Sequence, residues 1–430
     1  MKNLLYIFFA LLIVSTSCNR EEDDIFDKTP QQRKQELKKK YLDIIHNSEF
    51  GWKVQVEPGR EDVGVYNYFI NFNKEKGKAF VSTDADIMEF ASKLDSSLYE
   101  VRYTQEMTLS FTTYSQINIF YQPTSEDVNG FGGDVDLLFK EVSPDKIVLE
   151  GKTNGGKYTF TKAESNEYVA MLDEIRNIEL NLAYITLDDE YKFPTLTLKN
   201  GKKLFFKINW LTRGVLLRYN KGTELVERFI KVNFDNKGMI LQEPVELDGQ
   251  KITRLNFDED NYKFVIADEG VEGELTIDGL PAYSGKGLVD IFEKIKFGPI
   301  TGWSKPAKTL RRALEGINDR FTTLQYYNDP KVFIGWSFKF SDESEWPHIT
   351  FKGKKFEKLG EDRLRFVPDQ VVNEPGGTID LNEVLKTPEA KAIYDILFAP
   401  EGFVLYREIG VRLISLKDPY FWILMSDFSD

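Results

Sequence analysis

The feature that most constrains the fold is a hydrophobic alternation with a period of two, which recurs along most of the chain. The stretch "YNYFINF" at residues 66–72 places aromatic and aliphatic side chains on one face and mainly asparagine on the other. This is the pattern of a β-strand whose two faces meet different surroundings. Further strands are predicted at residues 107–114, 116–122, 135–142, 146–152, 157–163, 195–210 as a hairpin, 227–234, 238–247, 252–257, 262–267, 332–340, 348–356, 403–409, 411–416 and 420–428. Short spacings favour antiparallel hairpins.

Helical spacing of apolar residues appears between these runs. Thr29 is a predicted N-cap, followed by Pro30 in the first turn and Gln32 in a capping box. Other helices are predicted at residues 165–178, 288–295, 310–324, 381–385 and after Pro388, while 84–101 is ambiguous and 368–377 is a looser stretch. The Asn200-Gly201 pair favours a type I′ turn. The expected class is therefore α+β: β-rich antiparallel meanders with packed amphipathic helices.

Length indicates more than one domain. About 400 residues after any leader exceed one typical hydrophobic core, so two or three domains are expected. The predicted division is a signal peptide at 1–17, an acidic tether at 18–28, a helix plus antiparallel β domain at 29–182, a β-rich domain with a closing helix at 183–298, and a C-terminal α+β domain at 299–430. The two β-rich stretches before residue 298 are similar enough in layout to suggest a duplicated unit.

The first residues predict where the protein works. Lys2 precedes an apolar run from Leu4 to Val14, which has the layout of a signal peptide and is too short to span a membrane. The sequence Ser15-Thr16-Ser17-Cys18 resembles a bacterial lipobox, although Ser15 stands where Leu or Val is usual. Cys18 is therefore the predicted lipid attachment point, since two or three acyl chains anchor a protein firmly. A secreted protein with an ordinary cleavage site is the alternative.

The four acidic residues at 21–24 resemble a surface-export signal of Bacteroidetes lipoproteins, which would place the protein on the outer face of the outer membrane. A solvated linker without a sorting role is the other interpretation. The chain has a net charge of −13, so broad contact with nucleic acid is not expected. Its single cysteine excludes an intramolecular disulfide, and stability must come from core burial.

Residues for catalysis are scarce. The only histidines, His46 and His348, belong to no HExxH motif, and no phosphate-binding GxxxxGK[ST] sequence occurs. A glycosidase needs only two carboxylates, but 69 acidic residues make such a pair impossible to identify from the sequence. Acidic positions at 84–86, 134–136 and 258–261 do not match the twelve-residue calcium loop. No catalytic residue, metal or cofactor is predicted.

Aromatic side chains are the remaining candidates for ligand contact, because sugar rings and peptide side chains stack on them. Periodicity assigns Trp52, Trp210, Trp336 and Trp422 to the core. Trp303, in the loop "GPITGWSKPAK", and Trp346, in "SDESEWPHIT", are candidate platforms, as are Tyr326 and Tyr327. Capping of the core is the alternative for each.

The stretch "FGGDVDLLFKEVSPDKIVLEGKTNGGKYTFTKA" at residues 131–163, following "EFGWKV", resembles an uncharacterised family of Bacteroidetes outer-membrane lipoproteins with a domain of unknown function. The resemblance implies genes near starch-utilisation-like import loci, and it assigns no functional residue. The expected function is a surface-exposed, non-catalytic accessory that binds a glycan or peptide nutrient for an outer-membrane importer. A carboxylate-dependent hydrolase and a protein-binding scaffold are the alternatives.

Overall fold

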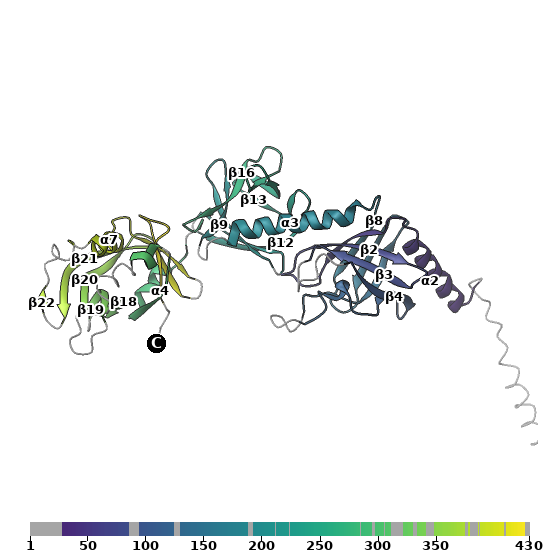
Figure 1. Ribbon diagram of the computed structural model, residues 1–430, viewed down its shortest axis with the longest axis horizontal. Coiled ribbons are helices and arrows are strands. Elements are labelled where there is room, and N and C mark those ends of the chain that lie inside the picture. The colour runs from purple at the N-terminus through teal and green to yellow at the C-terminus, as the bar shows by residue number, and fades with distance from the viewer. Residues whose placement is uncertain are drawn as a thin grey trace, which may run out of the picture. The chain divides into compact units, whose positions relative to one another are not determined.

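The structure is a computed structural model, shown in Figure 1. It describes residues 28–425 except 86–93, 124–129, 188–191, 211, 223, 284, 295–296, 305, 311–320, 330–332, 341–347, 375–376, 379–385, 387 and 408–409, and it leaves out most side chains of residues 297–355. The chain divides into two compact units, Met1–Arg60 with Asn67–Ala170, and Glu61–Tyr66 with Met171–Asp430. The domain boundaries expected from the sequence stay predictions.

The first unit is built on a closed antiparallel barrel of eight strands in sequential order. Its strands are β1 (Trp52–Glu57), β2 (Tyr66–Asn73), β3 (Lys78–Thr83), β4 (Asp95–Tyr103), β5 (Met107–Phe111), β6 (Asp136–Val142), β7 (Lys146–Gly151) and β8 (Lys157–Lys162). β1 closes the ring by pairing with β8, from Trp52 opposite Lys162 to Glu57 opposite Lys157. Alternate residues of β1 (Trp52, Val54 and Val56) are at most 1% exposed, so the period of two does mark the core.

Helix α2 (Pro30–His46) packs against this barrel. The predicted capping box is present: the Thr29 hydroxyl accepts from the backbone N–H of Gln32, whose side chain accepts from the backbone N–H of Thr29. Ile45 is buried, and its carbonyl accepts a hydrogen bond of 2.9 Å from the indole of Trp52. Residues 30–40 of the helix are exposed. Only the C-terminal part of α2 is therefore held by the core.

One prediction in this unit is wrong, and one ambiguous segment is partly resolved. Residues 116–122 form no strand; they contain the short 3₁₀ helix η2 (Gln116–Asn118), which the Asn118 side chain stabilises by accepting from the N–H of Ser115. Ile117, Ile119 and Phe120 are all buried, so their apolar pattern reflects a packed turn, not an alternating strand. Residues 95–101, which were ambiguous, lie in β4 and pair with β3 and β5.

The second unit contains another closed antiparallel barrel, in which β9 pairs with both β10 and β16. Its strands are β9 (Phe193–Leu198), β10 (Lys203–Asn209), β11 (Gly214–Lys221), β12 (Glu224–Asp235), β13 (Gly238–Leu247), β14 (Gln250–Asp258), β15 (Lys263–Ile266) and β16 (Gly273–Asp278). Helix α3 (Glu167–Leu187) contributes Leu172, Ile175 and Leu182 to the core of this unit. The hairpin at 195–210 is confirmed, but its turn is not type I′.

That turn differs because only Gly201 adopts a left-handed conformation, with φ of 82°. A type I′ turn requires positive φ at both central residues. Here the N–H of Gly201 bonds to the carbonyl of Leu198, and the N–H of Leu198 bonds to the carbonyl of Lys202. The longer connection matches the pairing of Lys203 with Thr197.

The third sheet, also in the second unit, has nine strands: β17 (Phe297–Trp303), β18 (Phe321–Asp329), β19 (Phe333–Phe340), β20 (His348–Lys358), β21 (Arg363–Glu374), β22 (Gly377–Thr378), β23 (Phe403–Arg407), β24 (Val411–Ser415) and β25 (Trp422–Met425). β21 pairs with β20 and with β23, so the strand order closes on itself. Helices α4 (Leu288–Lys294) and α7 (Pro388–Leu397) supply Val289, Phe292, Ile393 and Leu397 to its core.

The structure of this sheet tests three predictions. β25 lies between β17 and β24, which confirms that the last strand is central. The predicted helix at 310–324 runs too far, since Phe321 and Leu324 lie in β18. The stretch 368–374, expected to be loose, belongs to β21 despite Pro368. The β-rich antiparallel class is thus confirmed, and no helix among the described residues is long and apolar enough to cross a membrane.

Candidate functional site

The structure places three of the four aromatic residues that the sequence singled out in two neighbouring strands, β17 and β18. Trp303, expected in a loop, ends β17 and lies opposite Ile423 of β25. Tyr326 and Tyr327 are consecutive residues of β18, where they pair with Gly298 and Phe297 of β17. The side chains of these three residues, and Trp346 and Cys18 entirely, lie outside the described part of the chain. Their roles in ligand binding and lipid attachment stay predictions.

The remaining tryptophans mostly follow the prediction. Trp52 and Trp336 are 0% exposed and Trp422 is 6% exposed, which confirms them as core residues. The prediction that Trp210 is a core residue is wrong, because it lies half-buried in the turn after β10.

The acidic positions considered for a cation are explained by internal hydrogen bonds. Asp134 is buried and accepts from the backbone N–H groups of Thr153 and Asn154, at 2.8 and 2.9 Å. Asp258 accepts from the backbone and side chain of Asn261 within one turn. Among the described residues, no group of three or more metal-ligating side chains comes together.

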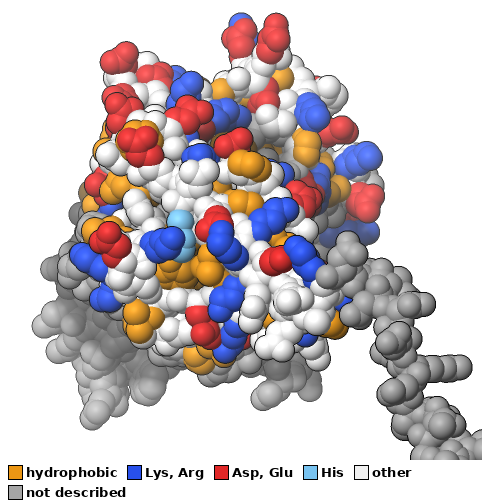
Figure 2. Space-filling view, turned by 90° about the vertical axis from the view of Figure 1, so that its right-hand side faces the viewer, with side chains coloured by type: hydrophobic (Ala, Val, Ile, Leu, Met, Phe, Trp, Pro, Cys, Tyr) orange, Lys and Arg blue, Asp and Glu red, His pale blue; other side chains and the backbone are white. Residues whose placement is uncertain are grey.

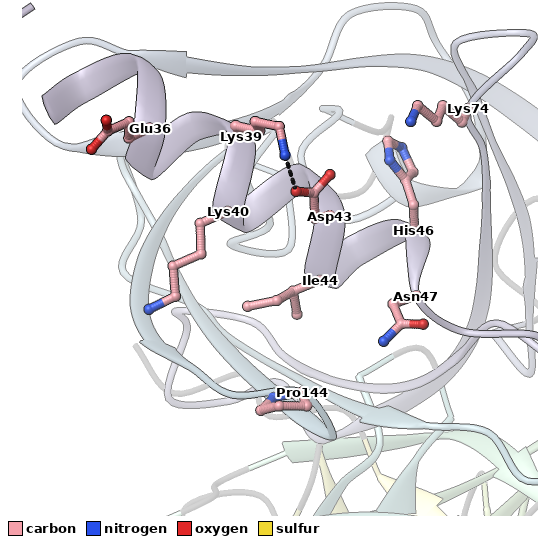
Figure 3. Close-up of a pocket in the computed structure, with 9 residues that line it drawn as sticks. All are labelled: Glu36, Lys39, Lys40, Asp43, Ile44, His46, Asn47, Lys74 and Pro144. Atoms are coloured by element: carbon pink, nitrogen blue, oxygen red, sulfur yellow. Dashed lines mark hydrogen bonds and ion pairs between the residues drawn. The ribbon is translucent and has the colours of Figure 1, made fainter. Parts of the chain in front are cut away.

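A groove lies along α2 in the first unit. It encloses about 800 Å³ and is lined by Glu36, Lys39, Lys40, Asp43, Ile44, His46, Asn47, Lys74 and Pro144. Figure 3 shows that most of these side chains come from α2 and its C-terminal end, while Lys74 and Pro144 approach from two barrel turns. We call this surface the α2 groove.

Helical spacing explains the α2 side of the groove. Residues three, four and seven apart lie on one face of a helix. This spacing brings Glu36, Lys39, Lys40 and Asp43 onto the same face of α2. The Nζ atom of Lys39 is 2.8 Å from Asp43 Oδ2, and that of Lys28 is 2.7 Å from Glu36 Oε1. Both carboxylates of the groove are therefore already paired with a lysine.

Two lysines of the groove have no such compensation. Lys40 and Lys74 form no ion pair with any residue that the structure describes, and both are exposed. Figure 2 shows basic, acidic and apolar side chains beside the single histidine visible on this face. The groove therefore offers net positive charge in a chain whose overall charge is −13.

His46 lies at the end of α2 between charged and apolar neighbours. Its Nε2 atom is 2.5 Å from the hydroxyl of Tyr99, and its Nδ1 atom is buried without a hydrogen-bond partner among the described residues. Burial lowers the pKa of His46, and the positive charge of Lys74 lowers it further, while Asp43 acts in the opposite sense. Burial raises the pKa of Tyr99. A neutral imidazole accepting from a protonated Tyr99 hydroxyl fits both shifts.

The groove is not arranged as a pair of hydrolytic carboxylates. Glu36 and Asp43 are seven residues apart on one helix, roughly 10 Å along its axis. The hydrogen bond from Lys39 lowers the pKa of Asp43, whereas a general acid requires a raised pKa. What the groove offers chemically is a set of hydrogen-bond donors and two free cations for binding.

Sequence reasoning missed this groove. The only signals were the run Lys38-Lys39-Lys40 on an otherwise acidic chain and the rarity of histidine. Lys74 follows Lys40 by more than thirty residues, and only the fold brings the two into one surface.

Comparison with known proteins gives a family and little else. A family model described as "Domain of unknown function (DUF4302)" matches residues 22–259, more than half of the chain. No curated protein matches. A solved DNA polymerase III subunit beta from Borrelia burgdorferi, in complex with a natural product, aligns over 93% of this chain and 98% of its own at 10% identity. Its TM-score of 0.16 is too low to indicate a common fold.

Proposed function

We propose that this chain, which belongs to the DUF4302 family, is a surface-exposed outer-membrane lipoprotein that binds a nutrient without catalysing a reaction. In this proposal Cys18 carries the lipid, and a glycan or peptide nutrient is passed to an outer-membrane importer. The fold is taken as α+β, with helices packed beside antiparallel meanders. The resemblance to Bacteroidetes lipoproteins supports the location and the neighbourhood of an import system.

The observation that carries the binding function is the α2 groove, with its two unpaired lysines. An open surface of about 800 Å³ lined by lysine, asparagine and histidine can hold a polar ligand by hydrogen bonds and charge. Its two carboxylates are exposed and neutralised by lysines, which favours binding over hydrolysis. A hydrolase and a protein-binding scaffold are outcomes that the experiments below would reveal.

The location is tested by replacing the anchoring residue. Cys18→Ala should move the protein from the membrane fraction to the soluble fraction, since the anchor depends on acyl chains. Protease added to intact cells should digest the wild-type protein if it is exposed at the surface. A variant that stays with the membranes would show that Cys18 is not the anchor.

The binding function is tested with the full chain on glycan and peptide arrays. Lys40→Gln combined with Lys74→Gln should weaken capture of the best ligand, because both lysines line the groove. Lys157→Gln is the matched control: it removes an exposed lysine of the same unit, in β8, that does not line the groove. Absence of any captured ligand, or equal effects of the two changes, would contradict the proposal.

A further inference from the structure

We infer that the α2 groove recognises a carboxylate-bearing saccharide through Lys40 and Lys74. The inference rests on the proposed function, and it adds the chemical class of the ligand and the residues that select it. The inference follows from the charge of the groove, from the two elements that carry the lysines, and from the side chains that line the surface between them.

Charge is distributed very unevenly in this chain. Residues 28–46 contain six lysines and arginines against two acidic residues, whereas the whole chain has 56 basic and 69 acidic residues. Both acids of this segment, Glu36 and Asp43, are engaged by lysines. Of the lysines that line the groove, Lys40 and Lys74 form no ion pair within the described part of the protein, and an anionic ligand would complete their charge.

The two lysines are held by separate elements. Lys40 lies on α2, and Lys74 lies in the turn between β2 and β3. This turn is shaped by the Asn73 side chain, which accepts a 2.8 Å hydrogen bond from the N–H of Lys76, and by Gly77, whose φ is 61°. The backbone position of Lys40 is thus set by α2 and that of Lys74 by a barrel turn, so the groove presents two charges from separate elements to the carboxylates of a ligand.

The surface between the lysines suits a saccharide better than a peptide. Its apolar lining consists of Ile44 and Pro144, enough for the C–H face of a sugar ring. Asn47 adds an amide that can both donate to and accept from hydroxyl groups. The lining of the groove includes no large apolar side chain besides Ile44 that would form a pocket for a peptide anchor.

Binding should depend on the carboxylates of the ligand. The full chain is titrated calorimetrically with an oligogalacturonate and with the same oligosaccharide after its carboxylates are reduced to alcohols. We expect binding of the first, weakening with added salt, and a loss of at least tenfold for the second. Lys40→Gln and Lys74→Gln should each weaken binding about two- to fivefold, the range of one exposed charge pair, whereas Lys157→Gln should not.

A variant with increased affinity separates recognition from misfolding. Asp43→Asn removes the partner of Lys39 and frees a third cation in the groove. Affinity for the oligogalacturonate should rise about two- to fivefold, an effect that a damaged fold cannot produce. An unchanged or lower affinity, with the wild-type fold verified by circular dichroism, would overturn the assignment of charge as the selecting feature.

His46 provides a direct reporter of the bound ligand. The charged groups facing it are Lys74 from the β2–β3 turn and Asp43 on its own helix, and Tyr99 of β4 contacts its ring. A carboxylate held near Lys74 should raise the pKa of His46, because an anion favours the imidazolium. The NMR titration needs only two histidine signals, and His348→Gln assigns them. No shift of the His46 pKa on saturation would place the ligand elsewhere.

The possible outcomes distinguish this inference from the proposed nutrient-binding function on which it rests. Binding of the reduced oligosaccharide with equal affinity, insensitive to Lys40 and Lys74, would refute the ligand class and leave a nutrient-binding protein. Stronger binding of poly-glutamate than of oligogalacturonate at the same groove would make the ligand an acidic peptide and also refute it. Absence of binding to any glycan or peptide would refute both proposals.

Discussion

The buried ion pair of the second unit is expected to contribute strongly to its stability. Arg213 is 0% exposed and donates to both oxygens of Glu179, at 3.0 Å from Nε and 2.6 Å from Nη2. Its Nη1 group donates to the carbonyl of Val65 at 3.1 Å, and its guanidinium lies 4.2 Å from the ring centre of Tyr66. Arg213→Met would leave the Glu179 carboxylate without these donors and the Val65 carbonyl without one.

The expected size follows from these contacts. Removing one partner of a buried ion pair costs about 3–5 kcal/mol, because the other charge stays in a poorly solvated place. Arg213 also has a φ of 49°, but Met at the same position bears the same backbone cost, so this strain does not enter the difference. Arg213→Met with Glu179→Met should cost less than Arg213→Met alone, since the Glu179 charge is removed together with its partner. The carbonyl of Val65 still loses its donor, which costs about 1–3 kcal/mol.

Amide hydrogen exchange followed by mass spectrometry is the suitable assay, since a chain with two compact units need not unfold in one step. Exchange in β11, which follows Arg213 directly, should accelerate strongly in Arg213→Met and only partly in the double variant. Arg228→Met is the matched control, because its pair with Glu243 is exposed and should contribute under about 1 kcal/mol. Equal acceleration by Arg213→Met and Arg228→Met would refute the reasoning.

Three other expectations can be checked separately. The lowered pKa of His46 means that the folded state binds its proton less readily than the unfolded state, so the melting temperature should fall as pH drops below about 6.5 and level off below the folded-state pKa, and His46→Gln should flatten this dependence. Deleting the chain from Trp422 onward should abolish folding of the third sheet, seen as loss of near-ultraviolet dichroism, because β25 pairs on both sides; a folded truncated protein would contradict its central role. Trp303→Ala and Trp346→Ala should each weaken ligand capture if these residues are platforms, and unchanged capture on the arrays would show that they are not.

Local sequence rules located most elements of this fold because they describe local causes. The strand at residues 66–72 and the capping box at Thr29 both depend on neighbours within a few positions, and both are confirmed, although both faces of the strand are buried at residues 66–70. The rules failed at residues 116–122, where a buried turn has the same apolar content as a strand. They failed again at Phe321, because apolar residues at helical spacing continue into a segment whose backbone is paired with β19.

The candidate site could not be predicted from the sequence, because its cause is not local. Each lysine of the α2 groove is unremarkable in its own segment, and whether a lysine is neutralised depends on carboxylates that approach from other elements. The ion pair between Lys39 and Asp43 could be predicted from the sequence, because residues four apart on a helix are neighbours. That Lys74 meets α2 without a carboxylate of its own depends on how the barrel closes.

From the sequence alone, one can derive the antiparallel strand content and the reliance on core burial without disulfides, since composition and short-range periodicity carry both. The expectation of a lipid anchor at Cys18 comes from the resemblance of residues 15–18 to a lipobox. Closure of the strands into rings, as β1 meets β8 and β9 meets β16, belongs to the tertiary structure. These pairings join residues 75 to 110 positions apart, and no local pattern encodes the partner of a strand edge. The positive groove is a product of that closure, because an uncompensated charge is defined only by everything that surrounds it in space.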